Sequence, residues 1–256
     1  MKMQIDFTGK RVLVTGGSSP IGRAVAAAYL EHGAVVAVQV PSQSLSEELS
    51  KELAHAEKLT CIVGDISEVS GCRAVVDTAV EKLGGMDVLV HASGFRADIK
   101  FEDVTPEDWD AAINGTFKAA TFCTQRALGS LKQSRGNIVN VATNLGLMGG
   151  PTGSSVHSAA MGSIVNMTRM EALRLGVDGV RSNCLCHGAI EESISGWGVG
   201  AELPASALNG ELKVRPIGRH GRVDDITPAI LFLSSPYAGF MTGSVIVSDG
   251  GKFSGC

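Results

Sequence analysis

The sequence alternates short apolar runs with longer segments in which apolar residues recur at helical spacing. Runs with the length and β-branched content of buried strands lie at residues 11–14, 35–40, 60–63, 86–90, 138–141 and 180–186. Helical segments are expected at residues 23–32, within 44–55, at 71–83, from 106 to about 130, at 155–175 and within 224–233. This order predicts the α/β fold class: a doubly wound, Rossmann-like domain with a parallel sheet of about seven strands and helices on both faces.

The loops that follow the predicted strands fall at the carboxyl edge of the sheet. Right-handed crossovers bring these loops around one crevice, so the sequence predicts a single site there. We expect residues 1–256 to form one domain, in which the Gly-rich, irregular segment 191–213 is a lid-like insertion.

Composition and net charge favour some classes of protein and argue against some kinds of binding partner. Hydrophobic residues make up 44% of the chain and charged residues 19%, and 32 glycines suit a buried parallel sheet joined by tight turns. A formal net charge of -4 without a basic cluster argues against nucleic acid or an anionic membrane as the main partner. No apolar run approaches the length of a membrane-spanning helix, and the N-terminus lacks a signal-like apolar segment, so we expect a cytoplasmic location.

The six cysteines are scattered along the chain without a paired framework, as expected for reduced thiols. Cys184 and Cys186 share one face of a predicted strand and precede His187, which suggests a metal-binding hypothesis. Two thiols without a second cluster make a poor tetrahedral site. Buried core thiols are therefore the preferred interpretation, and no metal is expected.

A glycine-rich turn, Thr15-Gly-Gly-Ser-Ser-Pro-Ile-Gly22, joins the first predicted strand to the first helix. Such a turn lets backbone N–H groups and a helix N-terminus approach a pyrophosphate, so it is typical of dinucleotide-binding folds. Pro20 suits a first helical turn, but it removes one N–H donor and adds bulk beside the phosphates. The turn predicts the fold; NAD or NADP is a candidate cofactor, and no bound cofactor is the alternative.

The stretch 136–175 carries the clearest resemblance to a known family. A buried strand crosses a Leu-x-Gly-Gly loop into a helix rich in small residues, as in the catalytic segment of short-chain dehydrogenases/reductases. The resemblance implies a Ser at the strand end and a Tyr-x-x-x-Lys pair on the helix. This sequence has Thr143 at the Ser position, Val156 at the Tyr position and Ala160 at the Lys position. Neither aliphatic side chain can exchange a proton, so the chain resembles a degenerate member of the family.

The resemblance covers essentially the whole chain and implies further site residues. Asn114 matches the family's fourth catalytic residue, an Asn that holds a water, and is expected to be structural here. Val40-Pro41 offers neither the acid that many NAD-using members place there nor the basic residues of NADP-using members. Glu192 is expected to face the pyrophosphate and repel it. If a cofactor binds, the matching contacts are Gly16, Ser18, Ile21, Gly22, Asp65, Gly94 and Ile190.

Three histidines lie near the predicted site. His157 and His187 are candidate substitutes for the missing acid, because imidazole titrates near neutrality. His157 is one helical step, about 100°, from Val156 and is expected to point away from the site. His91 ends a predicted strand, where we expect it to hydrogen-bond the backbone rather than a ligand.

Three functions remain open. The first is a non-catalytic subunit that assembles with an active, NAD(P)-dependent short-chain dehydrogenase acting on hydroxyacyl or other alcohol and ketone substrates. The second is an enzyme with relocated acid/base chemistry, either an atypical ketoreductase or a non-redox cyclase, lyase or isomerase. The third is a dinucleotide-responsive regulator. The resemblance also implies a dimer or tetramer, with itself or with a complete subunit, through the helices around 106–130 and 155–175.

Overall fold

The computed structural model describes residues 4–53, 56–94, 99–149, 155–196 and 215–255. Its strands are β1 (Arg11–Thr15), β2 (Val35–Val40), β3 (Leu59–Val63), β4 (Val88–His91), β5 (Asn137–Thr143), β6 (Arg181–His187) and β7 (Val245–Ser248). Its α-helices are α1 (Pro20–Glu31), α2 (Gln43–Glu52), α3 (Val69–Leu83), α4 (Pro106–Ile113), α5 (Ala119–Ser134), α6 (Ser155–Leu175), α7 (Glu191–Gly196) and α9 (Val223–Ser234). The predicted strands are all present, and only their ends differ.

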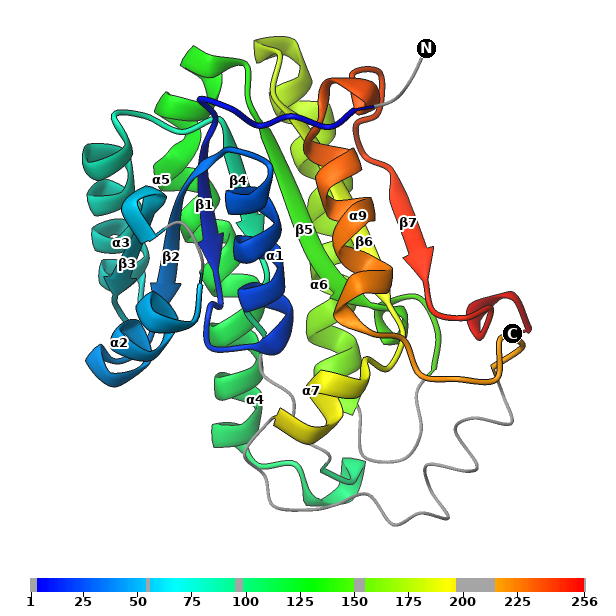
Figure 1. The fold of residues 1–256 in the computed structure, drawn as a ribbon. Helices are drawn as coiled ribbons and strands as arrows, with labels where there is room; N and C mark the ends of the chain where they lie inside the picture. Colours follow the sequence, from blue (N-terminus) through cyan, green and yellow to red (C-terminus); the bar gives the residue numbers. More distant parts are fainter. Residues whose placement is uncertain (1–3, 54–55, 95–98, 150–154, 197–214, 256) are drawn as a thin grey trace.

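The strands form one sheet of 7 in the order β3-β2-β1-β4-β5-β6-β7, and its strand pairs are parallel (Figure 1). This arrangement confirms the predicted Rossmann-like α/β fold. After β3 the chain crosses to the other side of β1 and enters β4. The order of strands therefore reverses between β1 and β4, which is where ligands bind in open α/β sheets.

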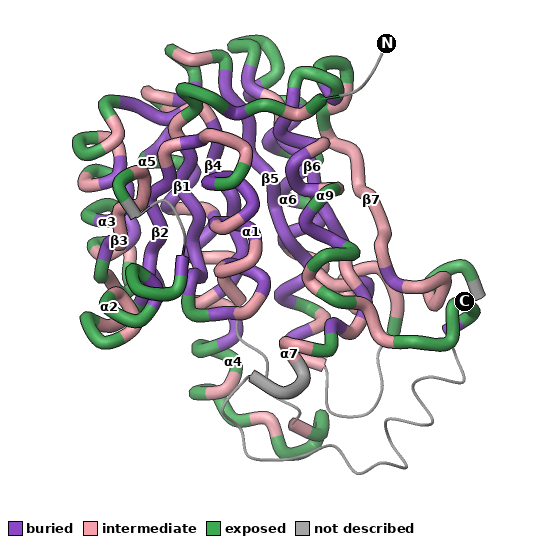
Figure 2. The backbone as a smooth tube through the Cα atoms, in the orientation of Figure 1, coloured by how far each residue is buried: buried purple, intermediate pink, exposed green. Residues whose placement is uncertain are grey.

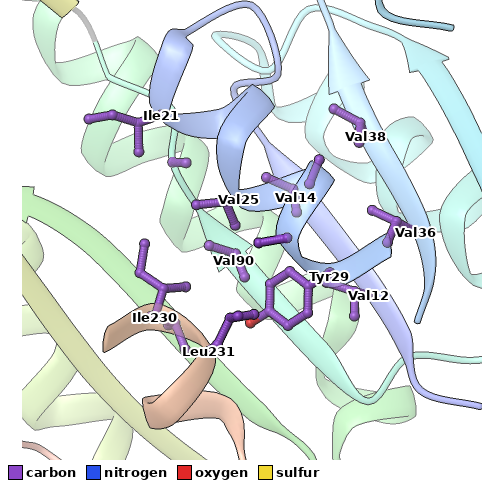
Figure 3. Close-up of a cluster of buried hydrophobic side chains, with 14 of the residues drawn as sticks. Val12, Val14, Ile21, Val25, Tyr29, Val36, Val38, Val90, Ile230 and Leu231 are labelled. Atoms are coloured by element: carbon purple, nitrogen blue, oxygen red, sulfur yellow. The ribbon is translucent and has the colours of Figure 1, made fainter. Parts of the chain in front are cut away.

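Helices cover both faces of the sheet, and its inner strands β1, β2, β4, β5 and β6 are mostly buried, whereas the edge strands β3 and β7 are partly exposed (Figure 2). On one face, α1 and α9 pack against β1, β2 and β4 around Tyr29 (Figure 3). The Tyr29 hydroxyl donates to Ser234 Oγ at 2.7 Å, and its ring meets Phe7 edge-on at 4.9 Å. On the other face, α3 and α5 form a second core cluster, and α6 packs against β6 in a third. These cores fix the loops of the carboxyl edge from both sides.

Two expectations differ from the structure or lie beyond it. The single helix expected from residue 106 is divided, because Asn114–Lys118 forms a π-helical segment between α4 and α5. Of the lid-like segment 191–213, only the part in α7 lies within the described residues, so its role as a lid stays a prediction. Within the described chain, no helix has the length and apolar character needed to cross a membrane.

Candidate functional site

The glycine-rich turn after β1 packs tightly against the loop that follows β4. Gly16 has a φ of +81°, and a Cβ there would lie 2.6 Å from Ala92 O and from Ser93 N. Ser19 caps α1: its Oγ accepts from Gly22 N at 3.0 Å and donates to Gly16 O at 2.9 Å. Glycine at position 16 is therefore required by both backbone conformation and space. The turn points the N-terminus of α1 at the switch point of the sheet.

A pocket of about 340 Å³ opens at this switch point. Four of the predicted cofactor contacts line it: Gly16, Ser18, Asp65 and Gly94. Ile21, Gly22 and Ile190 are buried and lie outside this lining, so cofactor contact by these three residues stays a prediction.

Gln39 lies in the floor of this pocket, and sequence reasoning missed it. Its Oε1 accepts from Gly16 N at 2.9 Å, and its Nε2 donates to Gly64 O at 2.8 Å. The side chain is only 3% exposed. The amide therefore ties the glycine turn to the end of β3. A polar residue inside the apolar run Val35–Val40 was the available signal.

Asp65 sits at the pocket wall and bonds its own loop. Its Oδ1 accepts from Ser67 Oγ at 2.7 Å and from Ser67 N at 2.8 Å. These two bonds lower the pKa of the Asp65 carboxyl. The carboxylate is thus ionised at neutral pH and holds the turn into α3.

Thr143, at the end of β5, is the centre of the expected catalytic position. It pairs with His187 of β6 in the sheet register, and its Oγ1 lies 3.5 Å from His157 Nε2. The expectation that His157 points away from the site is therefore wrong. Side chains in the first turn of a helix lean toward its N-terminus, which carries the buried imidazole of His157 toward the strand end. Ala160, one turn further along α6, is fully buried.

The remaining predicted site residues are His187, Glu192 and Asn114. His187 Nδ1 lies 2.6 Å from the carbonyl oxygen of Gly188. Glu192 does not project as expected: its Oε2 accepts from Val223 N at 3.3 Å, and its Oε1 lies 3.6 Å from Arg222 Nε. The N-terminus of α9 thus holds this carboxylate. Asn114 starts the π-helical segment.

His91 also differs from expectation. Instead of a backbone group, its Nε2 meets Thr124 Oγ1 at 2.9 Å, and its Nδ1 lies 3.5 Å from Thr15 Oγ1. Burial lowers the pKa of His91 to about 3, so the ring is neutral. The side chain belongs to the interior beneath the pocket and not to its surface.

Cys184 and Cys186 are both fully buried, with their Sγ atoms 3.8 Å apart in the core beneath α6. They are core thiols, as predicted. Across the described residues, no three His, Cys, Asp or Glu side chains come together as metal ligands.

A parallel sheet with a glycine turn and a pocket at its switch point defines a Rossmann-type nucleotide-binding fold. A family model described as enoyl-(acyl carrier protein) reductase matches residues 16–252. The chain belongs to the short-chain dehydrogenase/reductase family.

Curated relatives and solved structures agree with this assignment. The chain is 32% identical to 3-oxoacyl-(acyl-carrier-protein) reductase FabG of Thermotoga maritima, over 95% of this chain and 97% of the relative. It is 30% identical to (2S)-((R)-hydroxy(phenyl)methyl)succinyl-CoA dehydrogenase subunit BbsD of Thauera aromatica, over 94% and 95%. A crystal structure described as a short-chain alcohol dehydrogenase of Sinorhizobium meliloti superposes with a TM-score of 0.91 at 29% identity, covering 98% of both chains.

Members of this family generally bind NAD or NADP, and the residues present fit only part of such a cofactor. The pocket and Asp65 suit an adenine ring. The end of β2, Val40-Pro41, supplies no carboxylate for ribose hydroxyls and no cation for a 2′-phosphate. Val156 and Ala160 supply neither a proton donor nor an ammonium at the nicotinamide end. No catalytic step through the cofactor is therefore derived for this chain.

Proposed function

We propose that this chain is a non-catalytic subunit of a short-chain dehydrogenase and assembles with a catalytically complete, NAD(P)-dependent relative. The observation that carries the proposal is the pair of aliphatic side chains on α6. Val156 and Ala160 are four residues apart and so lie on nearly the same face of the helix, where a proton donor and its cationic partner would be needed. Neither side chain can donate or accept a proton. The packing that shapes the site is nevertheless retained.

An exposed apolar stripe on α6 and the turn after it supports the assembly. Met170 and Leu173, three residues apart on α6, are 51% and 81% exposed, and Val177 in the turn after the helix is 88% exposed. Apolar side chains grouped in this way on a surface mark interaction sites. We assign this stripe to contact with the complete subunit, through the helix pair α5 and α6.

The substrate class is proposed from the relatives. The Thauera aromatica relative is, by its name, one subunit of a dehydrogenase for a substituted succinyl-CoA. The Thermotoga maritima relative is named as a reductase of 3-oxoacyl groups. A complex that contains this chain is therefore expected to interconvert an alcohol and a ketone on an acyl thioester or a related compound.

The first experiment is a calorimetric titration of NADH and NADPH into the purified chain, with its native mass recorded on the same sample. The subunit proposal predicts no detectable binding at millimolar cofactor and no ketone reduction by the chain alone. The tagged chain should co-purify with a relative that carries the Tyr-x-x-x-Lys pair. Turnover by the isolated chain would contradict the proposal.

Variants of the two subunits test the division of labour. Replacing the Tyr of the complete subunit should abolish turnover of the complex, whereas Thr143→Ala in this chain should leave it unchanged. Leu173→Glu should prevent co-purification while the chain stays folded by circular dichroism. Lys51→Glu on α2, far along the chain from the stripe, is the matched control and should leave the complex intact.

A second candidate function rests on one specific contact. His157 Nε2 lies 3.5 Å from Thr143 Oγ1. If Thr143 binds a substrate oxygen, the imidazole would be close enough to act as its general acid or base. The chain would then be an enzyme with relocated chemistry, either a reductase or a non-redox cyclase, lyase or isomerase. Activity of the isolated chain that is lost in His157→Gln, with a pH profile set by one imidazole, would favour this function over the first.

A further inference from the structure

The first turns of α6 run past the end of β5, and the contacts there determine which side chains face the loops of the site. A Cβ at Gly146, in the turn after Thr143, would lie 2.7 Å from the carbonyl carbon of Met161. Only a residue without a side chain allows the turn to lie this close to the helix backbone. This close approach fixes the rotation and the position of α6 relative to the end of β5.

Hydrogen bonds hold α6 in place further along the helix. Glu171 is 2% exposed, and burial raises the pKa of its carboxyl. Its Oε2 accepts from Asn140 Nδ2 of β5 at 3.0 Å and from Ser182 Oγ of β6 at 2.7 Å. Contacts at Met161 and at Glu171 thus tie both halves of the helix to the neighbouring strands.

His157 and Met161 are the residues that this placement turns toward the loops of the site. His157 Nε2 lies 3.5 Å from Thr143 Oγ1, at the end of β5. Met161 reaches the loop after β4, because a Cβ at Gly94 would lie 3.1 Å from Met161 Cε. Gly94 lines the pocket. Residues four apart differ by about 40° around a helix, so both side chains lie on one face.

The aliphatic pair one residue earlier on α6 is placed differently. Ala160 is fully buried, and Val156 is partly exposed. Among the described residues, the side chains within 4 Å of a Cβ at Gly94 are those of Met161 and Thr116. One residue corresponds to a rotation of about 100°, so Val156 and Ala160 face a different direction from the pair that meets these loops. The contacts of the site therefore fall one residue later than the sequence motif places them.

The chemistry of the Met161 side chain does not suit the nicotinamide end of a dinucleotide. Its thioether is uncharged, donates no hydrogen bond and accepts only weakly. Phosphate oxygens are held best by cationic donors. Met161 extends from its backbone contact with Gly146 to Gly94, so it lies between the end of β5 and the pocket. The proposal of a non-catalytic subunit keeps its basis with this pair, because Met161 supplies no cation either.

We propose that Met161 is the specificity-determining residue that excludes NAD and NADP from this crevice, and that His157 is its partner on the side of Thr143. This role rests on the proposed function in one respect, because both require that the isolated chain binds little or no dinucleotide. A dinucleotide that extends from the pocket toward Thr143 meets an uncharged thioether where it needs a cationic donor. The residue at position 161 therefore sets what the crevice admits.

The test is calorimetric titration of NADH into the purified Met161→Lys variant. Lysine is one atom longer than methionine and brings an ammonium to the edge of the pocket beside Gly94. Because hydrogen bonds to charged groups are the stronger ones, NADH should bind at least about ten-fold more tightly than to the parent, or than the detection limit for the parent. Ala159→Lys adds the same charge on the exposed side of the same turn and is the matched control. Met161→Gln, which is uncharged, should bind NADH no better than the parent.

The wild-type chain provides a measurement that does not depend on the folding of a lysine variant. With ¹³C-methyl methionine, the Met161 methyl signal is assigned by its loss in Met161→Leu. This signal should show a nuclear Overhauser effect to the α-hydrogens of Gly94. With ¹⁵N-histidine, the His157 signals should shift in Thr143→Val. They should not shift in Thr121→Val, which removes a hydroxyl that donates to Phe117 O on α5.

Three results would overturn the role of Met161. The first is NADH binding by a folded Met161→Lys that is no tighter than binding by Ala159→Lys. The second is the absence of the Overhauser effect between Met161 and Gly94, and the third is a His157 signal that ignores Thr143→Val. The proposed function fails separately, because absence of a co-purifying complete subunit would contradict it while these measurements on the isolated chain still stand.

Discussion

Replacing Gln39 tests whether its amide holds the pocket floor together. In Gln39→Leu, a side chain of similar size removes the bonds to Gly16 N and Gly64 O. Each buried hydrogen bond contributes about 1 kcal/mol, and an unpaired backbone group costs about 1–3 kcal/mol when water cannot reach it. Because the pocket is open to solvent at this point, water offsets part of that penalty. We therefore expect the free energy of unfolding to fall by about 2 kcal/mol.

Urea unfolding at neutral pH, followed by circular dichroism, measures this change. The free energy of unfolding of Gln39→Glu should fall by at least as much. This variant keeps an acceptor for Gly16 N but brings a carboxylate oxygen next to Gly64 O, which also accepts and cannot donate. Gln43→Leu, on the exposed start of α2, is the matched control and should stay within about 0.5 kcal/mol of the parent. A change in the free energy of unfolding of Gln39→Leu as small as that of the control would refute the reasoning.

Further variants test the core, the buried acid and the catalytic position. Tyr29→Phe should reduce the free energy of unfolding by about 0.5–1.5 kcal/mol, because a buried hydroxyl bond is lost while the ring packing stays. The raised pKa of Glu171 gives stability that is complete below its unfolded value of 4.5 and is lost as the pH rises through the folded value. As the pH rises, urea unfolding should therefore show the free energy of unfolding of Glu171→Gln increasing relative to that of the parent. The same difference in free energy between the two proteins in acidic and in mildly alkaline buffer would contradict this. The double variant Val156→Tyr/Ala160→Lys should reduce ketones no faster than the size-matched Val156→Phe/Ala160→Met, since the ribose contacts are also missing. A gain of about 100-fold in NADH-dependent turnover would show that only the catalytic pair was lost.

The sheet was predictable because buried parallel strands are nearly continuous apolar runs, as in Val35–Val40 and Asn137–Thr143. The π-helical break between α4 and α5 was not predictable from the sequence. Residues 106–134 have helical periodicity throughout, and a π-helical turn depends on packing between helices that are distant in sequence. The local sequence pattern does not determine that packing.

The places of Gly16 in the glycine turn and of Thr143 at the end of β5 were predictable, because motifs fix both positions along the chain. Contacts were not predictable where the partners come from other elements. His91 was expected to bond the backbone, but its partner is Thr124, thirty-three residues away on α5. Glu171 is a charged residue at an inward helical position, three and seven residues after Thr168 and Ile164, and this spacing was the missed signal.

The polar groups of the pocket help to choose between the two functions. A site built for a ligand keeps polar groups whose bonds the ligand completes, whereas a site that no longer binds one is free to satisfy them internally. Gln39 bonds both the glycine turn and Gly64 after β3, and Asp65 bonds its own turn through Oδ1. Glu192, outside the lining of the pocket, bonds the N-terminus of α9. These polar groups have internal partners without a ligand, which supports weak or absent cofactor binding and hence the subunit proposal over relocated chemistry at Thr143 and His157.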